Sequence, residues 1–268
     1  MSDRARARSP EPGWLSSDPE QAWAERWFLG YSVAWMLAVA VVIVTGWIFT
    51  WGDLGYLLFS GALGLAAVVG PWLWPGRPDR HRPAWQCWWL WLNAWVFVLV
   101  AFGTYFGTHY FFDLMGMRYA FPVTWTFQAE LVGHSPQQVP IFMYPLTQAY
   151  FVTYFVGATV LLRRLEHVLS LSVLGRALAV LALAYVIAFM ETFGMATDAL
   201  SAYFEYADRD RMLALGSLGY ASYFVVGLPL LRRIDRSWSL GRVLVQALAA
   251  CMLVLCLLEA WAKLVGPL

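Results

Sequence analysis

One carboxylate lies inside an otherwise apolar run of the chain. Glu191 follows YVIAFM and precedes TFGMA. An ionised carboxylate at membrane depth costs about 2.5–3.5 kcal/mol on insertion scales, so an isolated one tends to keep its proton. A protonated acid in an apolar pocket can donate a proton, which makes Glu191 the first candidate for chemistry. The alternative interpretation gives Glu191 no function: its side chain reaches the outer membrane interface or pairs with an arginine.

Further polar side chains stand beside apolar runs. Tyr105, His109 and Asp113 follow a spacing of i, i+4 and i+8, and they form one stripe if the helix continues. The alternative for His109 is a histidine that only packs. The two alanines Ala184 and Ala188 share a helical face with Glu191 and leave room beside it for a neighbouring helix or a ligand.

The segment YFEYADRDR carries a second group of charges. It brings Glu205, Asp208 and Arg209 to the level expected for Glu191 and His109, and Glu259 reaches the same level from the last apolar run. The alternative is a solvated loop with surface ion pairs. The convergence of these groups on one leaflet favours a functional site.

The composition indicates the class of fold that positions these residues. Of 268 residues, 60% are hydrophobic and 13% are charged, against roughly 25% charged in a soluble domain. A net charge of +1 provides no basic field for nucleic acid. Apolar runs of about 20 residues are long enough to cross a bilayer. We therefore expect an all-α, polytopic membrane helix bundle in one domain, with no nucleic-acid partner and with the lipid bilayer around it.

Seven such runs are present. Their approximate bounds are 27–49, 54–74, 86–106, 139–162, 175–196, 212–231 and 241–263. Residues 1–18 are expected to form a flexible tail. The longest connection, 107–138, is predicted to be a non-cytoplasmic or re-entrant segment, and its structure is left open.

The basic residues predict the orientation. Fourteen of 18 fall before the first run or in the second, fourth and sixth connections. The positive-inside rule then places the N-terminus in the cytoplasm. The excess of arginine over a single lysine, Lys263, is typical of a GC-rich and hence bacterial genome. We expect a multi-pass protein of the inner membrane if the source is bacterial, or of the endoplasmic reticulum if it is eukaryotic.

Several cofactor chemistries do not fit the chain. The four histidines are far apart in sequence, which argues against a di-iron or other metal site. Lys263 stands at the end of the last run and reads as an interfacial anchor rather than a retinal lysine. No glycine-rich dinucleotide motif follows a strand. We expect no metal and no cofactor.

The stretches YFGTHYFFDLMGMRYAFP, LRRLEH and ALAYVIAFMETFGMA, with YFEYADRDRM, resemble the cycloeucalenol cycloisomerase family of cyclopropyl sterol isomerases. The likeness extends in order over nearly the whole chain, and THYFF and METF are its most specific parts. It implies that the protein opens the 9β,19-cyclopropane ring of a sterol to give a Δ8 sterol. The natural substrate, cycloeucalenol, cycloartenol or another cyclopropyl triterpenoid, stays open, as does the oligomeric state.

The resemblance also selects site residues. The expected catalytic residues are Glu191, His109, Asp208 and Glu205, and the expected substrate-binding residues are Tyr105, Tyr110, Thr192, Asn93 and Arg209. The chain departs from the plant members at Asp113, Asp210 and Glu130, which are therefore not expected to be catalytic.

The implied reaction needs an acid, a base and a dry aromatic cage. Protonation at C19 places positive charge at C9, and loss of the C8 proton completes the isomerisation. Aromatic faces stabilise a cation by roughly 0.5–2 kcal/mol each. We expect Glu191 as the donor and His109 as the base or relay, with Asp208 and Glu205 tuning the pair. Two alternatives remain: a sterol double-bond isomerase, and a non-catalytic sterol-binding or transport protein.

Overall fold

The computed structural model describes residues 13–128 and 138–268. Within them, seven helical spans are long and apolar enough to cross a membrane, which confirms the predicted fold class. The first five are uninterrupted helices, named α1 (Pro19–Val44), α2 (Asp53–Leu73), α3 (Trp88–Phe106), α4 (Met143–Val168) and α5 (Val173–Met195). The last is α9 (Leu240–Val265).

The sixth span, Arg209–Leu231, is a composite. It consists of α6 (Arg209–Arg211), the π-helix η5 (Met212–Gly216), α7 (Ser217–Tyr220) and α8 (Ser222–Leu231). A second π-helix, η3 (His109–Leu114), follows α3. Such wide turns often occur at functional sites. Phe111 and Phe112 of η3 line the cavity described below, and η5 directly precedes α7, whose Tyr220 also lines it.

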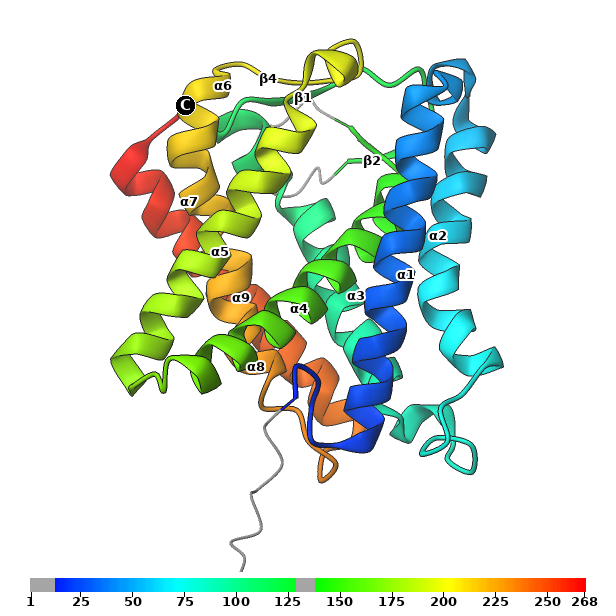
Figure 1. Cartoon of the computed structure of the whole chain (residues 1–268). Coiled ribbons are helices and arrows are strands. Elements are labelled where there is room, and N and C mark those ends of the chain that lie inside the picture. The colour runs from blue at the N-terminus through cyan, green and yellow to red at the C-terminus, as the bar shows by residue number, and fades with distance from the viewer. Residues whose placement is uncertain (1–12, 129–137) are drawn as a thin grey trace, which may run out of the picture.

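Short elements close one end of the bundle (Figure 1). The strands are β1 (Met117–Tyr119), β2 (Thr126–Phe127), β3 (Val139–Pro140) and β4 (Phe204–Tyr206), and β1 pairs antiparallel with β4 while β2 pairs with β3. The remaining turns are the 3-10 helices η1 (Trp47–Thr50), η2 (Ala84–Gln86) and η4 (Asp198–Leu200). Pairing of β1 with β4 joins the 107–138 connection to the segment after α5.

The first helix begins at Pro19, ahead of the apolar run that starts near residue 27. Asp18 caps it by accepting hydrogen bonds from the backbone N–H groups of Glu20 and Gln21 at 2.9 and 3.2 Å, and proline is favoured in the first turn. The helix ends before Gly46, whose φ of +73° suits a glycine. Residues 1–12 of the predicted tail lie outside the described residues, and Ser16 is held against α1 by a 2.8 Å bond to Glu25.

The core is centred on α3, which packs against α4 and α9, while α4 also packs on α1 and α2. Trp95, Leu92 and Leu99 of α3 are almost fully buried. By contrast, α5 keeps most of its apolar side chains on the outside, as expected for a helix that faces lipid. In Figure 1, α4 crosses the bundle diagonally between α5 and α1.

Ion pairs hold the helices together at the end opposite the strands. Arg163 of α4 forms a bidentate pair with Glu25 of α1 at 2.6 and 2.9 Å. Arg232 likewise binds Glu166 at 2.6 and 2.8 Å. This is the end at which the sequence places most of the basic residues. Parallel donation by the planar guanidinium fixes geometry as well as charge.

Candidate active site

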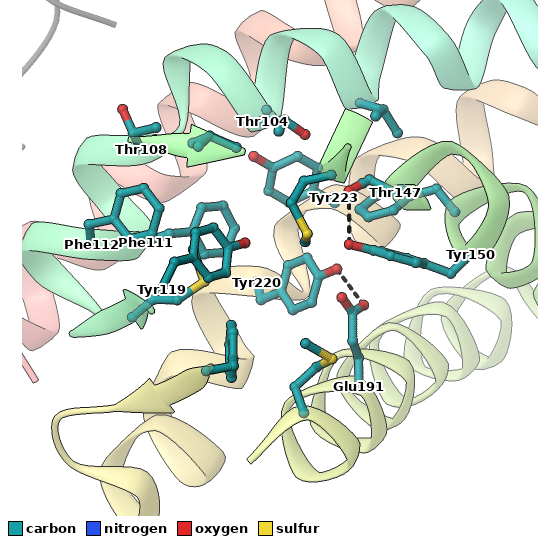
Figure 2. Close-up of a pocket in the computed structure, with 18 of the residues that line it drawn as sticks. Thr104, Thr108, Phe111, Phe112, Tyr119, Thr147, Tyr150, Glu191, Tyr220 and Tyr223 are labelled. Atoms are coloured by element: carbon teal, nitrogen blue, oxygen red, sulfur yellow. Dashed lines mark hydrogen bonds between the residues drawn. The ribbon is translucent and has the colours of Figure 1, made fainter. Parts of the chain in front are cut away.

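A cavity lies between the C-terminal half of α5 and the neighbouring ends of α3, α4 and α7, beneath β1 and β4 (Figure 2). Aromatic side chains dominate its wall. They are Phe111, Phe112, Tyr119, Tyr150, Phe151, Phe204, Tyr206, Tyr220 and Tyr223. They come from three separate stretches of the chain, 111–119, 150–151 and 204–223, so that only folding assembles the wall.

Among the residues that the structure describes, Glu191 is the sole acidic one that lines this cavity. Its Oε2 accepts a hydrogen bond from the Tyr220 hydroxyl, and the carboxyl group points into the cavity in Figure 2. Ala188 and Ala184, one and two turns earlier on α5, are fully buried. The small side chains let α5 lie close to its neighbours, so Glu191 faces the interior of the bundle rather than lipid.

Two more hydroxyls face the same space. Tyr150 and Thr147 of α4 share a hydrogen bond of 2.8 Å, and Figure 2 shows the Tyr150 hydroxyl directed toward Glu191 and Tyr220. Tyr223 reaches the cavity because Gly103 of α3 has no side chain. A Cβ at Gly103 would lie 2.8 Å from the Tyr223 hydroxyl oxygen, which is closer than van der Waals contact allows.

The wall also contains tyrosines from outside the spans. Burial, with a smaller effect of the Glu191 carboxylate, raises the pKa of the Tyr119 and Tyr206 hydroxyls above the ordinary value. Both hydroxyls therefore stay neutral across the physiological pH range. Neutral phenols can donate hydrogen bonds, and their ring faces attract a cation. The cavity thus combines one carboxyl group with neutral aromatic walls.

The cavity has a volume of about 90 Å³. Pockets for drug-sized ligands measure about 300–1,000 Å³. A molecule as large as a sterol therefore requires the lining side chains to move apart. The π-helix η3 borders this region, and its Phe111 contacts Tyr220 of α7 edge-to-face with ring centroids 5.6 Å apart.

The predicted pair of His109 and Glu191 does not meet at this cavity. His109 does not line it, and its Nδ1 lies 2.8 Å from Asp113 Oδ2. Tyr110 donates a 2.9 Å hydrogen bond to Glu259. The predicted single stripe also does not form, because α3 ends at Phe106 and the π-helix begins at His109. These groups form a separate polar cluster beside the cavity.

The charged residues near β4 point elsewhere. Glu205 is opposite Arg118 in the strand pair, at 3.4 Å. Asp208 accepts a 3.0 Å bond from the backbone N–H of Arg211 and so begins α6. Arg209 donates to the backbone oxygen of Ala196 at 2.9 Å. All three lie outside the cavity lining.

The remaining predicted residues have packing positions. Asn93 is buried between helices and donates to the backbone oxygens of Ala67 and Trp89 at 3.1 and 2.9 Å. Thr192 is fully buried next to Glu191, and Tyr105 packs against Phe106 with ring centroids 4.9 Å apart. Glu130, which the sequence analysis set aside, lies outside the described residues.

Sequence reasoning missed the tyrosines around Glu191. A signal was present, since Tyr150, Tyr220 and Tyr223 stand within apolar spans. A hydroxyl inside a bilayer needs a hydrogen-bond partner. Tyrosines in such runs therefore indicate an interior polar site, although they do not say which helices meet there.

Among residues 13–128 and 138–268, no group of three or more His, Cys, Asp or Glu side chains is close enough to hold a metal ion. The seven-helix bundle and the Glu191 carboxyl group in its tyrosine-walled cavity define the class of protein. It is a polytopic membrane protein with a site suited to proton transfer on an apolar molecule.

Comparison with known proteins identifies the family. The chain is 36% identical over 269 residues to the cycloeucalenol cycloisomerase of Arabidopsis thaliana, and the match covers 95% of this chain and 90% of that protein. The chain therefore belongs to the cycloeucalenol cycloisomerase family of isomerases, which confirms the resemblance found in the sequence. No family model matches the chain. No solved structure matches it either.

Proposed function

We propose that this protein opens the cyclopropane ring of a cyclopropyl sterol within the membrane and that Glu191 donates the proton. Membership of the family supports the reaction. The observation that carries the site assignment is the position of Glu191, the one acid among the described residues that lines the cavity walled by tyrosine and phenylalanine. We expect the protein in the inner membrane if its source is bacterial and in the endoplasmic reticulum if its source is eukaryotic. Fractionation of the host cells tests this location.

The proposed reaction balances without a co-reactant. The C9–C19 bond breaks, its electron pair takes the proton of Glu191 at C19, and positive charge is left at C9. The electron pair of the C8–H bond then forms the C8=C9 double bond. The proton released from C8 returns to the Glu191 carboxylate, directly or through the Tyr220 hydroxyl bonded to it. The enzyme thereby ends in its starting state.

The wall of the cavity has two tasks in this proposal. Its ring faces stabilise positive charge near C9 by cation–π attraction. Its apolar side chains exclude water, which would otherwise capture the cation as an alcohol. Tyr119, Phe151 and Tyr223 supply such faces from three different segments.

In this proposal His109, Glu205 and Asp208 do not contact the reacting atoms, because none of them lines the cavity. The role of His109 as base or proton relay stays a prediction. If His109 is the base despite its position, then His109→Gln will abolish turnover as completely as loss of Glu191 does.

The test is Glu191→Gln in membranes supplied with cycloeucalenol and, separately, with cycloartenol. The amide keeps the size of the side chain but cannot donate the acidic proton. We expect a fall in turnover of about 10³-fold, within the range for loss of a general acid, measured as the Δ8 product. Asp210→Asn is the matched control, since Asp210 is a highly exposed acid with 94% of its side chain accessible, and it should keep full activity.

The outcomes separate the alternatives. Full turnover by Glu191→Gln would remove Glu191 from the donor role. Isomerisation of a Δ8 sterol that has no cyclopropane would indicate a double-bond isomerase instead. Sterol binding without product after long incubation would indicate a binding or transport protein. In D₂O, deuterium in the C19 methyl group of the product reports that the donated proton exchanges with solvent.

A further inference from the structure

A second cavity lies between α1 and α2 at the arginine-rich end of the bundle. Its volume is about 830 Å³, and its lining is almost wholly apolar. We call it the α1–α2 groove and define it by Trp23, Trp27, Tyr31, Leu65, Leu73 and Trp74. It shares no lining residue with the cavity that contains Glu191.

Small residues create the space in this groove. Gly30 of α1 has no atom within 4 Å of the position that a Cβ would take. On the other side, Gly70 of α2 lets the ring of Trp27 approach, because a Cβ there would lie 2.3 Å from that ring. Trp27 stacks on Trp23 and on Trp74, with ring centroids 5.9 and 6.4 Å apart. The result is a flat aromatic wall beside an open slot.

The mouth of the groove is basic. A cavity of about 560 Å³ shares Trp23 and Arg26 with the groove and is also lined by Arg77 and Arg80. These three arginines are exposed. None of them forms an ion pair with a carboxylate among the residues that the structure describes. Arg82, in the same connection, is by contrast paired with Glu20.

We propose that the α1–α2 groove binds an anionic phospholipid, with its acyl chains on the tryptophan wall and its phosphate at Arg26, Arg77 and Arg80. Three uncompensated positive charges beside an apolar slot match a molecule that has a negative head and an apolar tail. A soluble anion has no apolar tail that would fill the slot, and a sterol has no negative charge that would pair with the arginines. Basic pockets between helices on the cytoplasmic side suit such lipids.

Charge removal tests the headgroup site. The full-length protein in a neutral detergent is titrated with phosphatidylglycerol or phosphatidylcholine, and the bound lipid is counted by native mass spectrometry. We expect one phosphatidylglycerol per chain, retained at least tenfold more tightly than phosphatidylcholine. The triple variant Arg26→Gln, Arg77→Gln and Arg80→Gln should bind both lipids equally.

The control for total charge is a second triple variant at the same end of the bundle. Arg176→Gln, Arg233→Gln and Arg242→Gln removes three exposed arginines that lie outside the groove. It should keep the preference for phosphatidylglycerol. Loss of the preference in this control as well, or equal retention of both lipids by the unmodified protein, would overturn the proposal.

Filling the slot tests the acyl-chain site. Gly30→Leu places a side chain in the open space and should lower retention of phosphatidylglycerol at least tenfold. The matched control is Gly61→Leu, since Gly61 of α2 also has nothing within 4 Å of its Cβ position but does not line the groove. Unchanged retention in Gly30→Leu contradicts the proposal. Cholesterol that displaces the lipid from the unmodified protein would assign the groove to a sterol instead. In that case, cholesterol should fail to bind in Gly30→Leu.

Discussion

Glu191 and Tyr220 belong to different spans, and the hydrogen bond between them joins the acid to the aromatic wall. A carboxyl group in a membrane interior is costly unless a partner satisfies it. The tyrosine supplies that partner without adding a charge. At this scale the site is a carboxyl group that accepts a hydrogen bond from a neutral phenol.

Removal of that phenol is the first test at the residue scale. Tyr220→Phe keeps the ring but deletes the donor to Glu191. Glu191 is charged once it has given up its proton, and a hydrogen bond to a charged group contributes about 1.5–3 kcal/mol. We expect turnover to fall about tenfold or more, with the sterol still bound. Tyr185→Phe, which removes a hydroxyl on α5 outside the cavity, should leave turnover unchanged. Equal rates for the two variants would exclude a role for the Tyr220 hydroxyl.

Asp79 provides a pH prediction at the same scale. It is 3% exposed in the connection between α2 and α3, and burial, followed by the nearby Glu20 carboxylate, raises its pKa to about 6. The folded state thus binds its proton more tightly than the unfolded state, whose value is about 3.9. The stabilising effect of that proton is complete below pH 4 and is lost as the pH rises through 6.

The variant Asp79→Asn mimics the protonated side chain. It should raise the free energy of unfolding by about 3 kcal/mol above pH 6, the equivalent of two pKa units, and should remove this pH dependence. Unfolding in detergent at pH 4 to 8 measures both effects. Asp198→Asn, at an exposed acid, should change neither. A steeper pH dependence in Asp79→Asn would contradict the assignment.

At the scale of elements, α1 is attached to α4 by a charge pair as well as by packing. Glu25 is fully buried and accepts both hydrogen bonds from Arg163. A buried pair of this kind gives little net stability, but loss of one member leaves an uncompensated charge. The junction should therefore be sensitive to single replacements and tolerant of paired ones.

Arg163→Met should lower the free energy of unfolding by about 3 kcal/mol, because Glu25 then stays buried without its cation. The double variant Glu25→Gln with Arg163→Met should recover most of that loss. Thermal unfolding in detergent measures both. The control is Arg233→Met, at an exposed arginine outside the pair. If the double variant is less stable than the single one, the buried charge is not the cause.

At the scale of the whole molecule, the two ends of the bundle differ in chemistry. One end has the arginines, the ion pairs and the α1–α2 groove, and the other has β1–β4 and the cavity with Glu191. The positive-inside rule assigns the first end to the cytoplasm. The proposed proton transfer then occurs in the opposite half of the bilayer.

Single cysteines test that orientation. In a chain whose native cysteines are replaced by alanine, Ser237→Cys lies before α9 and Ser201→Cys lies after η4, and both positions are exposed. An impermeant maleimide should label Ser237→Cys only from the cytoplasmic side and Ser201→Cys only from the other. The reverse pattern would invert the bundle, and labelling of both from one side would contradict seven crossings.

The sequence by itself determined the number of spans and singled out Glu191, because both depend on local composition. A run of about 20 apolar residues crosses the bilayer wherever its neighbours lie, and a lone acid in such a run is visible without a fold. Asp18 and Pro19 also mark the start of α1, a local capping signal that precedes the apolar run.

Only the tertiary structure decided which side chains share a cavity with Glu191. Tyr119, Tyr150 and Tyr220 come from β1, α4 and α7, and their meeting depends on how whole helices pack, which no local spacing encodes. The same holds for His109, which shares a leaflet with Glu191 in the predicted topology but is bonded to Asp113 within its own turn. Common depth in a membrane is a local property of the sequence, whereas contact is a property of the packed bundle.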